Sequence, residues 1–239
     1  MLLIFRKGMV RMREYASLQL LLDEDFEAAQ ERIIYLVTAY MDACGYVPCG
    51  RESAEHTFAF AHIKRGWVIF DDCADRLELN AFHGLCRCLT LRLSTNAVGV
   101  VGFRDGYMLR LYSEGALKDT FSTSPKKPRI PMGSLNWPGR AIRWRSVMRE
   151  GVSTKELSSA FLAARRKPEE GFEMLKKLLI LDDSAGYGFS SIEDAGLEGV
   201  VTLYFHAANR LRQHWLDRLL HVPAKCSGGA ATNFSRFKR

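Results

Sequence analysis

The chain has 239 residues, of which 47% are hydrophobic and 26% are charged, and this excludes a disordered or fibrous protein. Its formal net charge of +7 suggests nucleic acids or anionic membranes as ligands. No apolar run approaches the ~20 residues that span a bilayer, and the N-terminus lacks the apolar stretch of a secretion signal. We therefore expect a cytoplasmic protein without membrane contact, whose six cysteines are free thiols.

The first half of the chain predicts alternating strands and helices. Apolar residues recur at every second position over residues 15–22, and at helical spacing from Asp23 to about Gly45 and over residues 75–92. Five further segments read as strands separated by turn residues: 57–63, 67–71, 96–103, 107–112 and 116–121. The order is therefore β-α-β-β-α-β-β-β. Because sequential hairpins build antiparallel sheets, we expect a mostly antiparallel sheet with both helices on one face, an α+β domain over residues 15–122.

The second half predicts mainly helical structure. Residues 123–139 contain four prolines and two glycines, which excludes regular structure and indicates a connection. Helical patterns follow over residues 137–150, 154–166 and 169–181, and then a Gly- and Ser-rich segment over residues 182–199. Residues 200–206 fit either a strand or the start of a helix that runs to residue 220. The predicted divisions are a flexible N-terminus (1–14), the connection (123–139), a mainly helical domain (140–221) and a disordered basic tail (222–239).

The positive charge gathers in three segments. Residues 1–13 and 222–239 hold four basic residues each, residues 123–149 hold seven, and none of the three holds an acidic residue. The rest of the chain has 19 Lys and Arg against 27 Asp and Glu, so the folded body is acidic. The candidate partner-binding residues lie in the connection and the helical pattern that follows it: Trp137, Arg140, Arg143, Trp144 and Arg145.

Three interpretations of this basic segment remain open. Aromatic rings beside guanidinium groups suit the stacking of single-stranded nucleic acid, which would bind through residues 126–149. Alternatively, Trp137 and Trp144, seven residues apart on one stripe of a helix, pack on the first domain while the arginines meet its acidic surface. The third interpretation is an acidic protein partner. We favour docking within the chain for the segment itself.

An acidic cluster stands where the predicted strand 67–71 gives way to a helix. Asp71, Asp72 and Asp75 could hold a divalent cation or act as acid and base, with His62 directed toward them across the hairpin. Aspartates at this place also cap helices by accepting backbone N–H groups, and we favour this capping role. No set of Cys and His completes a zinc site. We therefore predict neither a metal nor another cofactor.

Motifs for catalysis are not found in the sequence. There is no Gly-x-Ser-x-Gly elbow, and Gly186-Tyr187-Gly188 lacks the Lys and Ser/Thr that complete a phosphate-binding loop. The cysteines lack a basic motif that would lower their pKa. We therefore expect a protein without catalytic activity, and we assign no catalytic residue.

Residues 104–125 carry a recognisable pattern, Leu-Tyr-x-x-Gly-x-x-x-Asp-x-aromatic-x-x-x-Pro. Its positions are Leu111, Tyr112, Gly115, Asp119, Phe121 and Pro125, preceded by the acidic turn at Asp105. This stretch resembles the signature of a group of uncharacterised bacterial α+β proteins, which have a second acidic residue where this chain has Phe103. The resemblance implies an α+β domain followed by a helical one, and no activity. Tyr112 and Asp119 are expected on neighbouring strands, where they can interact.

These observations give one leading hypothesis and two alternatives. The leading hypothesis is a non-catalytic module that binds another protein, in the manner of the immunity-type proteins that neutralise toxins. The first alternative is nucleic-acid binding through residues 126–149. The second is a hydrolase or metal-dependent enzyme around Asp71, Asp72 and His62, which requires these side chains to converge in one pocket.

Overall fold

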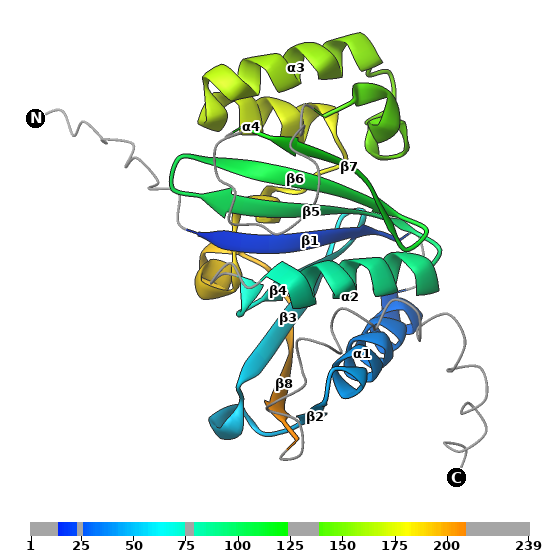
Figure 1. Ribbon diagram of the computed structural model, residues 1–239, viewed down its shortest axis with the longest axis vertical. Helices are drawn as coiled ribbons and strands as arrows, with labels where there is room; N and C mark the ends of the chain where they lie inside the picture. Colours follow the sequence, from blue (N-terminus) through cyan, green and yellow to red (C-terminus); the bar gives the residue numbers. More distant parts are fainter. Residues whose placement is uncertain (1–13, 23–25, 75–78, 124–138, 209–239) are drawn as a thin grey trace, which may run out of the picture.

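The protein forms one antiparallel sheet with helices on both faces (Figure 1). The computed structural model describes residues 14–22, 26–74, 79–123 and 139–208. Within these residues, eight strands lie in the order β2-β8-β3-β4-β1-β5-β6-β7. The strands are β1 (Tyr15–Leu21), β2 (Tyr46–Pro48), β3 (His56–Ile63), β4 (Gly66–Asp71), β5 (Asn96–Phe103), β6 (Gly106–Ser113), β7 (Ala116–Ser122) and β8 (Val201–Ala207). The predicted α+β class with an antiparallel sheet is confirmed.

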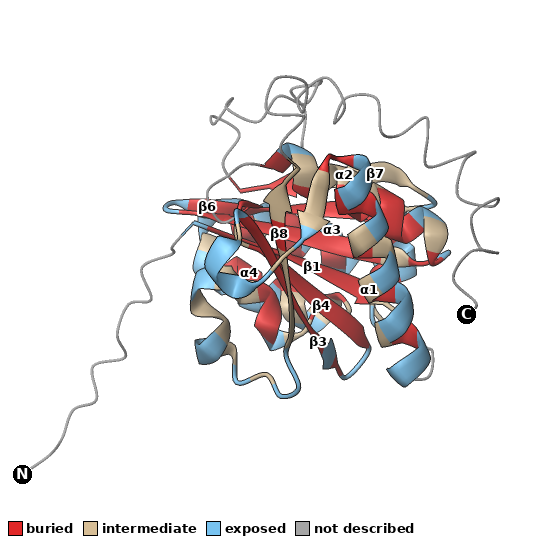
Figure 2. Ribbon diagram, turned by 90° about the horizontal axis from the view of Figure 1, so that it is seen from below, coloured by how far each residue is buried: buried red, intermediate tan, exposed pale blue. Residues whose placement is uncertain are grey.

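The helices divide between the two faces of the sheet. The α-helices are α1 (Phe26–Ala43), α2 (Leu79–Arg92), α3 (Thr154–Arg166) and α4 (Pro168–Leu178), and the 3-10 helices are η1 (Arg51–Ser53), η3 (Ala141–Val147), η4 (Asp183–Gly186) and η5 (Phe189–Ala195). Figure 2 shows the strands largely buried between helices whose outer sides are exposed. No helix in the described part of the chain combines the length and apolar character needed to cross a membrane.

Helices α1 and α2 cover one face, as the sequence predicts. Ile33, Val37 and Tyr40 are buried at helical spacing on α1, and they join Phe82 and Leu85 of α2 in one cluster on the sheet. The periodic apolar stripe therefore predicted the buried side of α1 correctly, because a stripe at 3.6-residue spacing has to be covered.

The second half of the chain covers the opposite face. Trp144 of η3 and Phe161 of α3 share a hydrophobic cluster with Val98, Leu109 and Leu111 of the sheet. Residues from both sides of the predicted connection thus form one core. The predicted domain limits at residues 122 and 140 stay a prediction. Residues 201–207 are a strand, paired with β3 on one side and with β2 on the other.

Strand β1 is buried on both faces, although its alternation suggested one exposed face. Leu18 joins the cluster under α1 and α2. On the other side, the Ser17 hydroxyl donates to the Ala185 carbonyl at 3.1 Å, and the Asp182 backbone N–H donates to Gln19 Oε1 at 2.9 Å. The polar positions of β1 are therefore satisfied by η4 and its N-cap rather than by water.

Candidate functional site

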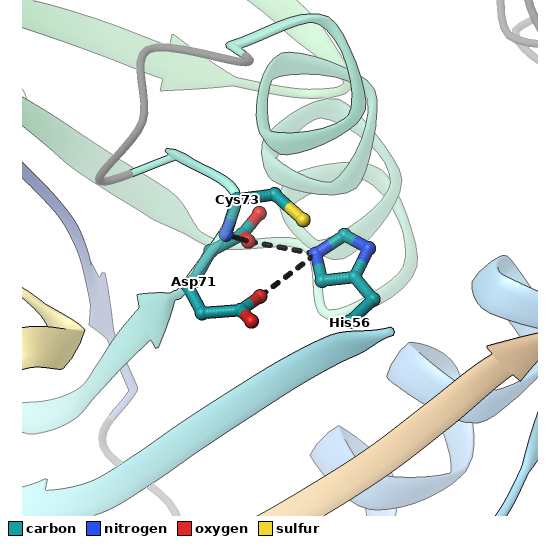
Figure 3. Close-up of side chains that lie close together, drawn as sticks. His56, Asp71 and Cys73 are labelled. Atoms are coloured by element: carbon teal, nitrogen blue, oxygen red, sulfur yellow. Dashed lines mark hydrogen bonds and ion pairs between the residues drawn. The ribbon is translucent and has the colours of Figure 1, made fainter. Parts of the chain in front are cut away.

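A buried histidine and aspartate meet where β3 begins and β4 ends. Phe58 of β3 pairs with Asp71 of β4, and His56 stands two residues before Phe58, on the same side of the strand. His56 Nε2 lies 2.7 Å from Asp71 Oδ1, and the two side chains are 3% and 0% exposed (Figure 3). The register of the β3–β4 pair therefore creates an ion pair inside the protein.

The carboxylate of Asp71 also organises the turn that follows β4. Its Oδ1 accepts the backbone N–H groups of Cys73 at 2.9 Å and Ala74 at 3.3 Å. The neighbouring Asp72 accepts the backbone N–H of Thr57 at 2.9 Å through its Oδ1. Asp71 therefore accepts N–H groups of the turn that follows β4, as a capping residue does, whereas Asp72 accepts one from β3. Asp75 lies outside the described residues.

Electrostatics favour a charged histidine beside a neutral thiol. Burial lowers the pKa of His56, but the charge and hydrogen bond of Asp71, together with the contact to Cys73, outweigh burial and raise this pKa to about 10. Burial raises the pKa of the Cys73 thiol, and the charge of His56 opposes this only in part. A thiol in this state is not an activated nucleophile, because the thiolate is the reactive form.

The same residues form a compact set of metal-donor types. His56, Asp71, Asp72 and Cys73 each offer one donor atom, and these atoms lie within 4.8 Å of one another. Among the described residues, this is the one group of His, Cys and acidic side chains with such spacing. Two of the four, Asp71 and Asp72, are candidates from the sequence alone. His56 is not among the candidates, because the predicted strand begins at residue 57.

The predicted pairing of His62 with the carboxylates is wrong. His62 pairs with Trp67 beside the hairpin turn, six residues along β3 from His56, or roughly 20 Å at ~3.3 Å per residue. Its ring packs edge-on against Trp67 and Phe26. The alternation of side chains along β3 places His62 on the same side of the strand as His56, but Asp71 lies at the other end of the β3–β4 pair.

The basic segment after the connection docks on the sheet through Trp144. Its indole Nε1 donates to Asp119 Oδ2 at 2.7 Å. The same carboxylate oxygen accepts the backbone N–H of Arg140 at 2.6 Å, and the Arg143 guanidinium donates to the Lys118 carbonyl at 2.8 Å. This is the contact that the docking interpretation predicts for Trp144. The arginines do not meet an acidic surface as that interpretation expects, because Arg143 donates to a backbone carbonyl and neither Arg140 nor Arg145 forms an ion pair within the described residues. Trp137 lies outside the described residues.

Residues 141–147 form a 3-10 helix instead of the predicted α-helix. Ala141, Trp144 and Val147 are buried, which is the three-residue period of a 3-10 helix. Ile142 and Arg145, also three residues apart, therefore share an outward side, and Ile142 is 54% exposed. We call the exposed side chains of Arg140, Ile142 and Arg145 the η3 surface.

The expected interaction between Tyr112 and Asp119 is absent. Asp119 pairs with Leu111 on β6, across a register shift from Tyr112, and neighbouring residues on a strand point to opposite faces. The Tyr112 hydroxyl instead lies 3.0 Å from His83 Nδ1 of α2. Asp119 thus contacts η3, whereas Tyr112 contacts α2 on the other face of the sheet.

Comparisons with family models, with curated proteins and with solved structures give no match for this chain.

Proposed function

We propose that the protein is a non-catalytic module that binds an acidic protein partner through the η3 surface. One observation carries the proposal: Arg140, Ile142 and Arg145 are exposed on a segment that Trp144 and Asp119 fix from beneath. Side chains held in place before binding lose less conformational freedom on association, and this increases affinity.

The composition of the surface favours an acidic partner. Residues 140–167 contain eight Lys and Arg against two Glu. The guanidinium groups of Arg140 and Arg145 have no partner among the described residues. Arginine pairs with carboxylates in a planar fork and is enriched at protein interfaces. Helix α3, which packs against η3, also carries an exposed apolar side chain, Leu162 (61%).

The interior contacts argue against base stacking on Trp144 and against a hydrolase at the end of β4. Stacking of nucleic-acid bases needs exposed aromatic faces, and the Trp144 ring is fully buried. A hydrolase at the end of β4 needs an accessible nucleophile or base. There, the carboxylates hold backbone N–H groups, and burial keeps the Cys73 thiol protonated.

The test is affinity capture with a charge-reversed variant. The full chain and its Arg140→Glu/Arg145→Glu variant are used as baits in nuclease-treated lysate of the native cell. The captured protein is then purified and its affinity is measured by calorimetry at low and high salt. We expect reversal to weaken binding at least about tenfold, the cost of ~1.4 kcal/mol, and added salt to weaken it as well.

A matched control separates the surface from net charge. Lys64→Glu/Arg65→Glu makes the same charge change at the exposed β3–β4 turn, and we expect it to leave the affinity unchanged. Equal loss in both variants, or full binding by the η3 variant, contradicts the proposal. A captured component that nuclease removes supports the nucleic-acid alternative instead.

A further inference from the structure

The four donor atoms around His56 are close to the arrangement that a bound metal ion requires. Donors that surround a zinc ion at about 2.0–2.3 Å lie roughly 3.3–3.8 Å from one another in a tetrahedron. Here His56 Nε2 lies 2.7 Å from Asp71 Oδ1 and 3.9 Å from Asp72 Oδ1, and no pair exceeds 4.8 Å. Side-chain adjustments of about 1 Å or less therefore suffice for a common centre.

One carboxylate oxygen in this cluster lacks a partner. Asp71 is fully buried, and its Oδ2 has no hydrogen bond among the described residues. A buried polar atom without a partner is unfavourable, by about 1–3 kcal/mol, and such atoms are uncommon in folded proteins. Figure 3 shows the carboxylate of Asp71 and the sulfur of Cys73 directed toward the His56 ring. The oxygen that faces His56 Nε2 is Oδ1, so a cation bound by both oxygens of the carboxylate supplies the missing partner of Oδ2.

Surrounding contacts already orient the donors. The His56 ring stacks on Phe58 with centroids 4.5 Å apart, and Tyr46 packs edge-on against it at 5.8 Å. The backbone N–H groups of Thr57 and Cys73 hold Asp72 and Asp71. Such outer contacts fix ligand rotamers in metal sites and contribute 10- to 100-fold, in order of magnitude, to metal affinity.

We propose that His56, Asp71, Asp72 and Cys73 form a binding site for a divalent transition metal of the zinc type. Imidazole, thiolate and carboxylate together suit Zn²⁺ and Co²⁺, whereas Mg²⁺ and Ca²⁺ take oxygen ligands. On binding, the metal displaces the protons of the Cys73 thiol and the His56 ring, and no other bond changes. Asp72, 24% exposed, gives the route from solvent. The site is independent of the η3 surface.

Cobalt titration tests the site directly. The full-length protein is stripped with a chelator and titrated with Co²⁺. We expect one equivalent to give a near-ultraviolet thiolate-to-cobalt band and visible bands of tetrahedral intensity, both removed by Zn²⁺ and unaffected by excess Mg²⁺. A spectrum without the thiolate band overturns the proposal, because Cys73 is then not a ligand.

Two variants distinguish this site from other thiols. Cys73→Ser keeps the size of the side chain, and we expect it to lose the near-ultraviolet band, while Asp72→Asn weakens cobalt binding at least about tenfold. Cys49→Ser, a half-buried thiol outside the cluster, is the control and retains the full spectrum. If Cys73→Ser keeps the band, or Cys49→Ser loses it, the assignment is wrong. Circular dichroism confirms that each variant is folded.

Discussion

Trp144 and Asp119 join the second half of the chain to β7, a strand at the edge of the sheet. The indole Nε1 donates to Asp119 Oδ2 at 2.7 Å, and the Trp144 ring is fully buried. Hydrogen bonds to a carboxylate are stronger than those between neutral groups. This contact gives the aspartate on β7 a structural role.

Substitution of Asp119 is expected to loosen η3. Asp119→Ala removes the acceptor of two N–H groups, one from Trp144 and one from the Arg140 backbone. We expect a loss of about 2–3 kcal/mol in the free energy of unfolding, measured by urea denaturation. Glu114→Ala removes an exposed carboxylate paired with Lys118 and should leave the midpoint unchanged. Equal midpoints for wild type and Asp119→Ala would show that the contact does not stabilise the fold.

The side chains of the η3 surface are expected to contribute nothing to stability. Arg140 and Arg145 are exposed, and their side chains form no hydrogen bond, ion pair or ring contact within the described residues. Arg140→Glu/Arg145→Glu should therefore keep the free energy of unfolding within about 0.5 kcal/mol of wild type. Thermal denaturation of the purified variant checks this. A larger loss would mean that reduced partner binding reflects unfolding rather than surface charge.

The elements that follow local periodicity were predictable from the sequence, and those that depend on long-range contacts were not. The buried side of α1 follows from apolar residues at helical spacing, since Ile33, Val37 and Tyr40 need no other information. The 3-10 form of η3 depends on Asp119, which is more than twenty residues earlier in the chain. Residues 137–150 do not contain that acceptor. Their own spacing of apolar residues therefore predicts an α-helix.

The cluster around His56 also combines residues that local sequence indicates with one that only long-range pairing brings in. Asp71 and Asp72 stand out in the sequence as adjacent acids after a strand, and they were identified as candidates. His56 is fifteen residues from Asp71, and only the pairing of Phe58 with Asp71 brings the two together. Period-2 alternation gives the side of a strand but not the register with its neighbour. Alternation therefore places His62 on the same side of β3 as His56, but His62 lies at the opposite end of the β3–β4 pair.

Close packing between α3 and α4 predicts a large effect of one methyl group. A Cβ added at Gly171 would lie 2.2 Å from Ala164 Cα and 2.3 Å from Ala164 Cβ, and neither atom can rotate away. Although alanine favours a helix by about 1 kcal/mol over glycine, we expect Gly171→Ala to lower the free energy of unfolding by about 1–3 kcal/mol.

Gly50→Ala is the matched control for this substitution. An added Cβ there meets no atom within 4 Å, and the backbone φ is −77°, so alanine fits without strain. We expect its stability to be unchanged or slightly higher, by up to about 1 kcal/mol. Chemical denaturation of both variants measures the difference. Equal effects at the two sites would contradict a tight helix–helix contact at Gly171.

His83 on α2 predicts the pH dependence of stability. Burial, together with the positive charges of Arg110 and Arg87, lowers the pKa of His83 to about 4. Because the folded pKa is lower than the unfolded value of ~6.5, the unfolded chain takes up a proton that the folded protein does not, between about pH 6.5 and 4. The contribution of His83 to the free energy of unfolding is therefore fully present above pH 6.5. It is lost as the pH falls, by up to about 3 kcal/mol.

His83→Gln separates this contribution from the carboxylates that titrate in the same range. Glutamine keeps a polar group near the Tyr112 hydroxyl, which lies 3.0 Å from His83 Nδ1, and it carries no titrating proton. We expect urea denaturation to show a smaller loss of stability for the variant than for wild type between pH 7 and pH 4.5. NMR of the folded wild type should show a neutral His83 ring at pH 5. Parallel pH profiles for the two proteins, or a charged ring at that pH, would mean that the neighbouring arginines and burial do not hold His83 neutral.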